Sequence, residues 1–269
     1  MDYDYASALP RKRFFIHMFT RDISLHDCIL DLIDNAIDAL IRRDKIDLID
    51  EAMVQVEPKS QKPKARIDLT ISGSRVRIQD NCGGITPDRA ATEVFTFGHA
   101  VHGAALTTHG LGAYGVGLKR ALFKIGGKFC VRSHTAQSGF EVSANLEEWI
   151  AEDDSLDDWR FPMRLLKPTT TRKAGTTIEI THIHTEVRDL LESEDFRDRL
   201  RRETARAYSM FLKKYVDIFI DDTPVEPINI PLGFSGDYQP ETDEWDTDGV
   251  HVRLVPGLAI PDRHDQWPI

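Results

Sequence analysis

The sequence contains few cysteines, no long hydrophobic run and no excess of positive charge. Its three cysteines, Cys28, Cys82 and Cys130, are far apart and in no C-x-x-C pair, so they predict neither a disulfide framework nor a zinc site. No apolar run approaches the roughly 20 residues that cross a bilayer, and the N-terminal stretch lacks the apolar core of a signal peptide. We therefore expect reduced thiols, no membrane partner and a cytoplasmic protein.

Charge and missing motifs exclude further classes of function. Lysine and arginine total 34 against 44 acidic residues, a formal net charge of −10, which disfavours a surface that binds nucleic acid phosphates by itself. No G-x-x-x-x-G-K-[ST] segment occurs, so a Walker P-loop is excluded. Residues 110–115 match a dinucleotide fingerprint, but no convincing strand precedes them, and we reject a Rossmann site.

The stretch from Ser24 to Arg43 is predicted to be an amphipathic helix. Its apolar residues recur at helical spacing, Ser24 can cap the first turn, and Asp27 is placed to reach back as in a capping box. Asp31 and Asn35 are one turn apart and close to the apolar face, so their side chains project side by side. Such a pair can hold a water molecule and a metal ion between them.

Other segments predict a mixture of strands and helices in one domain, residues 1–222. Residues 223–248, rich in Pro, Gly and Asp, are expected to be a linker, and 249–269 the start of a second domain. Strands are expected at 14–19, 66–71, 75–79, 128–133, 139–146, 159–166, 177–183 and 216–222, and helices at 87–94, 118–126 and 194–215.

Three further elements place glycines or a carboxylate where a strand or helix begins or ends. Asp80 ends a predicted strand and leads into a glycine turn, residues 112–117 open a helix, and Gly175-Thr176 enters a strand. A carboxylate at a strand end can accept a hydrogen bond from an adenine amino group, and glycines at a helix start expose N–H groups to phosphate oxygens. An Asn oxygen suits Mg²⁺, and a nearby carboxylate can deprotonate an attacking water.

The order and spacing of these four elements resemble the GHKL superfamily of ATP-binding proteins, the gyrase B, Hsp90, histidine kinase and MutL group, also called the Bergerat fold. The resemblance spans about residues 14–180 and is closest in style to the Hsp90-like and MutL-like members. It implies an α+β fold, a two-layer sandwich of a mixed, mostly antiparallel sheet covered on one face by helices. The matching motifs are the N box Asp31-x-x-x-Asn35-x-x-Asp38, the first glycine box Asp80-x-Cys82-x-Gly84, the second glycine box Gly112-x-x-Gly115-x-Gly117 and the final Gly175-Thr176.

The resemblance also implies the roles of individual residues. Asp31 would be the general base, Asn35 the Mg²⁺ ligand and Asp80 the adenine contact, while residues 95–111 would be the ATP lid. Apart from the resemblance, Lys119 and Lys124 both follow the second glycine box, and of the two only Lys119 is expected to pair with a phosphate. The other residues expected to bind ATP are Asp38, Gly84, Gly112, Gly115, Gly117 and Thr176.

Two positions depart from the family pattern. Hydrolytic members usually carry Glu where this chain has Asp31, which is one methylene shorter, so we expect slow turnover. Cys82 stands where the first glycine of its box is usual, which is tolerable only if the backbone there does not need a positive φ.

The function we predict is Mg-dependent ATP binding with slow hydrolysis, which drives lid closure and either dimerisation or the movement of a following domain. The alternative is a nucleotide-gated interaction module that does not hydrolyse ATP. A sensor histidine kinase is less favoured, because only about 30 residues precede Asp31, too few for a phosphoacceptor hairpin. We expect a nucleotide-dependent homodimer whose protein or DNA partner binds outside this domain. Zinc is less favoured than solvated side chains at His99, His102, His109, His182 and His184.

Overall fold

An eight-stranded sheet is the largest element of this computed structural model, which describes residues 10–46, 63–97, 116–151, 159–170, 173–228, 232–233, 243–247, 250–254 and 258–259. Its strand order is β5-β4-β3-β6-β2-β1-β7-β8. Neighbouring strands are antiparallel except β1 and β7, which are parallel. The strands are β1 (Ala65–Ser72), β2 (Arg75–Asp80), β3 (Gly126–His134), β4 (Gly139–Asn145), β5 (Met163–Leu166), β6 (Gly175–Ile183), β7 (Val216–Ile220) and β8 (Thr223–Pro224).

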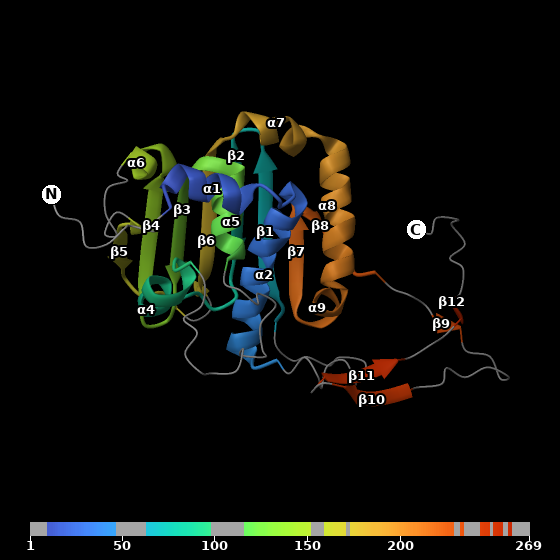
Figure 1. Cartoon of the computed structure of the whole chain (residues 1–269). Coiled ribbons are helices and arrows are strands. Elements are labelled where there is room, and N and C mark those ends of the chain that lie inside the picture. The colour runs from blue at the N-terminus through green and yellow to red at the C-terminus, as the bar shows by residue number, and fades with distance from the viewer. Residues whose placement is uncertain are drawn as a thin grey trace.

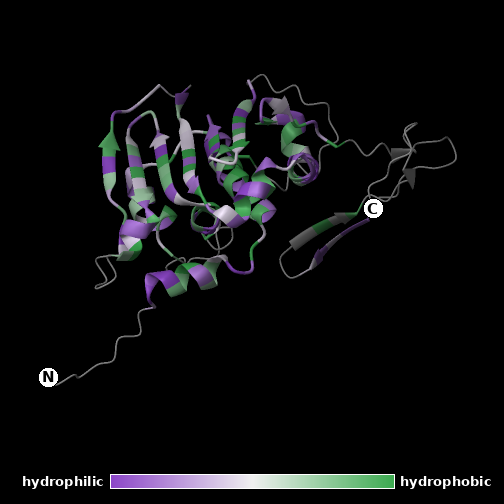
Figure 2. Cartoon of the chain, turned by 90° about the horizontal axis from the view of Figure 1, so that it is seen from above, coloured by the Kyte–Doolittle hydropathy of each residue, from purple (hydrophilic) through white to green (hydrophobic). Residues whose placement is uncertain are grey.

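Helices cover one face of this sheet (Figures 1 and 2). The exposed side chains of the other face are mostly polar. The strands alternate in burial: in β1, for example, Ile67 and Leu69 are buried while Arg66 and Thr70 are exposed. The predicted two-layer α+β architecture is therefore confirmed. The helices are α1 (Lys12–Thr20), α2 (Leu25–Asp44), α4 (Pro87–Arg89), the π-helix η1 (Ala90–Val94), α5 (Gly117–Ile125), α6 (Leu146–Ala151), α7 (Thr185–Glu192), α8 (Glu194–Ala207) and α9 (Ser209–Lys214).

Helix α1 corrects the prediction of an edge strand at residues 14–19. Phe15 and Phe19 lie one turn apart and pack their rings against Phe97, at centroid distances of 4.8 and 5.7 Å. The buried Lys12 amine donates a hydrogen bond of 2.6 Å to the carbonyl oxygen of Trp149, which ties the helix to the core. The periodicity of a six-residue run that is apolar except for one histidine does not distinguish a strand from a helix, and here these tertiary contacts decide.

The C-terminal part differs in detail from the prediction. Strand β10 (Asp243–Thr247) lies inside the stretch expected to be a linker and pairs with β11 (Val250–Leu254). Two short strands, β9 (Leu232–Gly233) and β12 (Leu258–Ala259), pair separately. The division into a domain at 1–222, a linker and a second domain stays a prediction.

Helices α6 and α7 were not expected from the sequence, whereas the hairpin β1–β2 and the helices α2, α5 and α8 were. Within the described part of the chain, no helix is both long and apolar enough to cross a membrane.

Candidate functional site

Helix α2 carries the N-box residues along the edge of its buried face. The Ser24 hydroxyl oxygen accepts the Asp27 N–H at 3.1 Å, and its proton goes to the Asp27 carboxylate at 2.7 Å, so the predicted cap is present. Asp31 and Asn35 are half-buried on this helix. The Asn35 side-chain nitrogen donates to the Asp31 backbone oxygen at 2.6 Å, which leaves the Asn35 amide oxygen as the atom available to a cation.

The Asp31 carboxylate lies against the first residue of α5. A Cβ atom added to Gly117 would lie 2.8 Å from Asp31 Cγ and 3.0 Å from each carboxylate oxygen, so no larger side chain fits there without displacement. The N box and the last glycine of the second glycine box, separated by more than 80 residues, therefore meet. The first turn of α5 also has N–H groups without intrahelical partners, which favour an anion.

The surroundings of Asp31 favour its protonated form more than water does. Its pKa is raised to about 6, mainly by burial and then by the negative charge of Asp34, and the positive charge of Arg120 opposes this rise. At neutral pH the group is still mostly ionised. It is a stronger base than an ordinary aspartate.

Asp80 ends β2 on the face covered by helices. Its carboxylate accepts the Cys82 N–H at 2.7 Å and a further bond from the Thr176 N–H. Burial raises the pKa of Asp80 to about 6, and these hydrogen bonds limit the rise because they favour the charged form. The carboxylate is thus fixed in direction by the backbone of two neighbouring segments.

Close backbone contacts explain the glycines beside Asp80. Gly84 has a φ of +74°, and a Cβ there would lie 2.1 Å from the carbonyl oxygen of His134. A Cβ on Gly175 would lie 2.0 Å from the carbonyl oxygen of Asp80. Cys82 is fully buried and does not have a positive φ, so this position does not need glycine.

Ser133 joins the first glycine box to the final Gly-Thr motif. Its hydroxyl oxygen accepts the Ile85 N–H at 2.8 Å, lies 2.9 Å from the Thr176 hydroxyl and lies 3.2 Å from the Gly175 carbonyl oxygen. Ser133 and Thr176 are paired in the register of β3 and β6. Asp80, Thr176 and Ser133 consequently form a row across β2, β6 and β3.

Lys119 is placed differently from the phosphate contact that we predicted. The side chain is fully buried, and its amine donates to the carbonyl oxygens of Val94 and Thr96 at 2.8 and 2.7 Å. Burial lowers its pKa to about 8. Reaching a phosphate would require the amine to leave these carbonyls, so the phosphate role stays a prediction.

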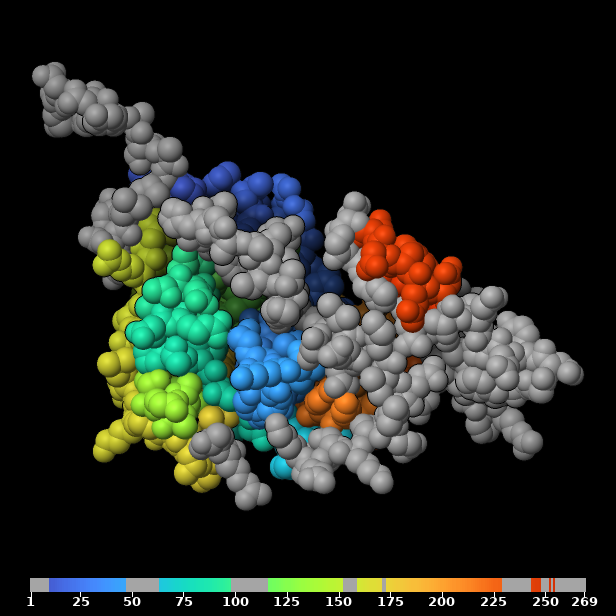
Figure 3. Space-filling model, turned by 90° about the horizontal axis from the view of Figure 1, so that it is seen from below, coloured from blue at the N-terminus to red at the C-terminus, as the bar shows by residue number. Residues whose placement is uncertain are grey.

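The remaining predicted residues lie at the edges of the described site. Asp38 is half-buried one turn beyond Asp34, near Arg42. Figure 3 shows this C-terminal half of α2 beside α4 and η1, and Arg42 interacts electrostatically with Arg89 and Glu93 there. Gly112, Gly115 and the predicted lid beyond Phe97 lie outside the described residues.

Sequence reasoning missed three residues that act on this site. The Tyr208 hydroxyl donates to Asp34 at 2.7 Å and also lies 3.1 Å from the Leu30 carbonyl oxygen, which binds α2 to the turn between α8 and α9. Arg120 faces Asp31 electrostatically from α5. Ser133, a polar residue at a buried position of an alternating strand, was recognisable in the sequence, whereas the other two depend on long-range packing.

The residues present fit Mg²⁺ held together with a phosphate ligand. Mg²⁺ prefers oxygen ligands and usually keeps several waters, so a single amide oxygen such as that of Asn35 suffices when phosphates supply the rest. Over the described ranges, no cluster of three or more His, Cys, Asp or Glu side chains could hold a metal by itself. His182 and His184 are therefore not part of such a cluster within these ranges. The other three histidines considered for zinc, His99, His102 and His109, lie outside the described residues.

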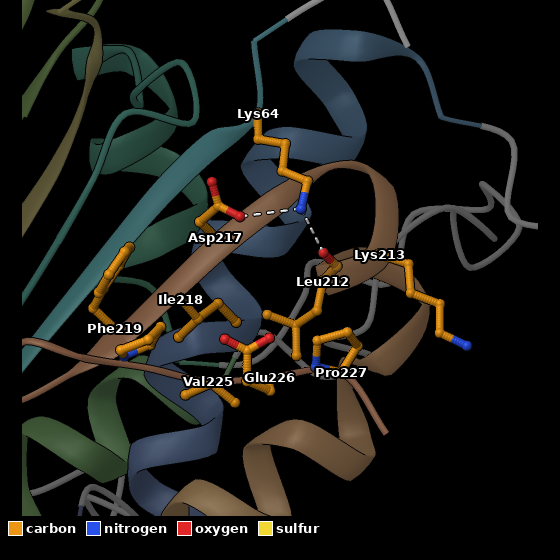
Figure 4. A pocket seen from close by; sticks show the side chains of 10 residues that line it. Lys64, Leu212, Lys213, Asp217, Ile218, Phe219, Val225, Glu226 and Pro227 are labelled. Atoms are coloured by element: carbon orange, nitrogen blue, oxygen red, sulfur yellow. Dashed lines mark hydrogen bonds and ion pairs between the residues drawn. The ribbon is translucent and has the colours of Figure 1, made fainter. Parts of the chain in front are cut away.

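A separate pocket lies toward the β7–β8 edge of the sheet, between α9, β7 and residues 224–227 (Figure 4). The Lys64 amine crosses its rim and donates to the Leu212 carbonyl oxygen at 2.9 Å and to Asp217 at 3.1 Å. None of the residues that line this pocket belongs to the four motifs. We therefore place the candidate site at the motifs and not in this pocket.

Comparison with known proteins identifies the family of this chain. The sequence profile of the histidine kinase-, DNA gyrase B- and HSP90-like ATPase family matches residues 23–176, more than half of the chain. The match begins just before α2 and ends at Thr176, so it contains all four motifs. No curated protein matches the sequence. The chain thus belongs to the histidine kinase-, DNA gyrase B- and HSP90-like family of ATP-binding domains.

Proposed function

We propose that this domain binds Mg-ATP and hydrolyses it slowly. The observation that carries the proposal is the contact of the Asp31 carboxylate with the first residue of α5, where a Cβ on Gly117 would lie 2.8 Å from Asp31 Cγ. It puts a basic group beside a helix start suited to phosphate. In the same fold, Asp80 presents a fixed acceptor at the end of the sheet, suited to an adenine amino group.

In this proposal each residue has one task. Asp31, mostly ionised at neutral pH, accepts a proton from the attacking water. Asn35 would hold Mg²⁺ through its amide oxygen, and the bound ion would neutralise phosphate charge. Gly117 keeps the space in front of Asp31 open. Asp80 and Thr176 bind the adenine ring of the nucleotide.

A non-hydrolysing, nucleotide-gated module is the second candidate. It is favoured by Asp31 itself, because the family's hydrolytic members usually carry the longer Glu at this position. In either case we propose that the nucleotide closes a dimer or repositions the segment after residue 222. This part rests on family resemblance and not on a contact within the domain.

The test combines nucleotide affinity with ATP turnover. Titration calorimetry of the whole chain with Mg-ATP should show one site, and the nucleotide should raise the melting temperature, because it binds only the folded state. Asp80→Asn should abolish most of both effects. Asp68→Asn, the same change on the polar face of β1, should leave both unchanged.

The outcomes separate the candidates. An unchanged thermal shift in Asp80→Asn would overturn the adenine assignment. Binding by the whole chain without ATP turnover above that of buffer would favour the non-hydrolysing module. No binding of ATP or ADP by the parent would overturn both.

A further inference from the structure

Ser133 occupies an unusual position for a hydroxyl group. It is fully buried on the face of β3 that otherwise holds Phe129 and Val131. Because an unpaired buried hydroxyl is destabilising, its three contacts must satisfy it. Thr176, its neighbour on β6, keeps an exposed fraction of 7%. Of the two residues, only Thr176 has any exposed surface.

The hydrogen-bond capacity of Ser133 favours one direction for the Thr176 proton, because only that direction satisfies all three contacts of Ser133. A serine hydroxyl has one proton to donate and two lone pairs that accept. The Ile85 N–H uses one lone pair, and the Gly175 carbonyl oxygen can only accept, so all three contacts are hydrogen bonds in one arrangement alone, the one in which Ser133 donates to Gly175. The contact of 2.9 Å with Thr176 is then a hydrogen bond only if Thr176 donates and Ser133 accepts.

This direction has a consequence for the ligand. With its proton engaged by Ser133, the Thr176 oxygen offers only lone pairs. The Asp80 carboxylate, which accepts the Thr176 N–H, is also an acceptor. Two adjacent acceptors fit the amino group at position 6 of adenine. They repel the carbonyl oxygen that hypoxanthine and guanine carry at that position.

We propose that Ser133 is a positioning residue that determines base specificity, by holding the Thr176 hydroxyl as a hydrogen-bond acceptor and thereby favouring adenine over 6-oxopurines. The inference rests on the proposed function, because it assumes that a purine nucleotide binds beside Asp80. It assigns a role to a strand, β3, that lies outside all four motifs. It also makes the role of Thr176 depend on a residue that is fully buried.

The experiment measures the affinity of the whole chain for ATP and for ITP, which differ at position 6 of the base. The parent should prefer ATP by about tenfold or more, the scale for one misdirected hydrogen bond in a buried site. In Ser133→Ala the Thr176 hydroxyl proton loses its acceptor. It can then rotate toward the carbonyl oxygen at position 6 of the hypoxanthine base of ITP. The preference for ATP should then fall by about tenfold, with a gain for ITP.

Three further variants separate positioning from general damage. Ser143→Ala, the same deletion on the exposed face of β4, should keep the ratio of ATP affinity to ITP affinity that the parent shows. Ser133→Cys keeps a side chain of similar volume that is a weaker hydrogen-bond acceptor, so its ATP:ITP affinity ratio should lie between those of the parent and Ser133→Ala. This variant tests the proposal if Ser133→Ala does not fold. In the background of Thr176→Val, Ser133→Ala should change the ratio no further, because Ser133 acts through Thr176.

The results decide as follows. A parent that binds neither nucleotide overturns the proposed function itself. A parent that binds both equally, or folded Ser133 variants that keep the full preference for ATP, overturns only the inference. A reduced ATP:ITP ratio in the Ser133 variants, absent in the Thr176→Val background, supports it.

Discussion

Asp80 and Asp31, at the two ends of the proposed nucleotide site, both have a pKa raised to about 6, yet they are held in different ways. Asp80 accepts N–H groups from Cys82 and Thr176 at a sheet end where the backbone is closely packed. Among the residues described, no donor is within hydrogen-bond distance of the Asp31 carboxylate. Its neighbours are instead the charges of Asp34 and Arg120.

The difference teaches what each end can do. A carboxylate whose lone pairs point in fixed directions is suited to recognising one fixed donor, as on a base. A carboxylate that has a raised pKa and accepts no hydrogen bond from the described residues is suited to accepting a proton from water. The comparison thus separates recognition on the sheet from proton transfer between two helices.

The largest expected effect tests the packing of the sheet end. Gly84→Ala places a Cβ 2.1 Å from the His134 carbonyl oxygen at a φ of +74°, which should lower the free energy of unfolding by about 2–4 kcal/mol. Urea denaturation measures this. Gly127→Ala is the matched control: its Cβ would meet only His182 atoms at 3.7 Å, so the loss should be much smaller. Equal losses would mean that the sheet end is not closely packed as described.

A smaller effect is expected at the helix end, on binding and not on folding. Asn35→Ala removes the amide oxygen assigned to Mg²⁺ and should weaken Mg-ATP binding by roughly tenfold or more. Binding of ADP in the presence of a chelator should change much less, because no ion is then present. Calorimetric titrations with and without Mg²⁺ make the comparison. A loss of the same size in both would assign Asn35 a structural role.

The predictions from sequence succeeded where the chemistry is local. The spacing of Asp31 and Asn35 and the cap at Ser24 are properties of one helix, and they are present on α2. The edge strand at 14–19 was wrong because contacts with Phe97, about 80 residues away, hold that run as a helix. Local pattern carries no information on such contacts.

The roles of the other residues of the site could be recognised only from the three-dimensional structure. Ser133 acquires its role only from the register that places it beside Thr176. Tyr208 reaches Asp34 across 174 residues of sequence. For Lys119, the position after the second glycine box predicted a phosphate contact, whereas packing directs its amine to two carbonyl oxygens, and the phosphate contact stays a prediction.

The smallest expected effect concerns the pH dependence of turnover. Since the active form of Asp31 is ionised, hydrolysis should fall as the pH is lowered through about 6 and level off above about 7. Asp34→Asn removes the negative neighbour that helps to raise this pKa, so the acid limb should move to lower pH. The profile of kcat/KM measures it. Asp189→Asn, a change at an exposed site on α7, should leave the acid limb of the pH profile unchanged. If Asp34→Asn also leaves it unchanged, Asp34 does not raise the pKa of Asp31.

Parallel measurement of affinity and turnover in Asp31→Asn and Asp80→Asn tests the division of tasks most directly. Asp31→Asn should bind Mg-ATP within about threefold of the parent and hydrolyse it about a hundredfold more slowly or worse, the usual scale for a lost general base. Asp80→Asn should instead lose most of its affinity. If Asp31→Asn hydrolyses ATP as fast as the parent, Asp31 is not the base, and the assignment of proton transfer to the helix end is contradicted.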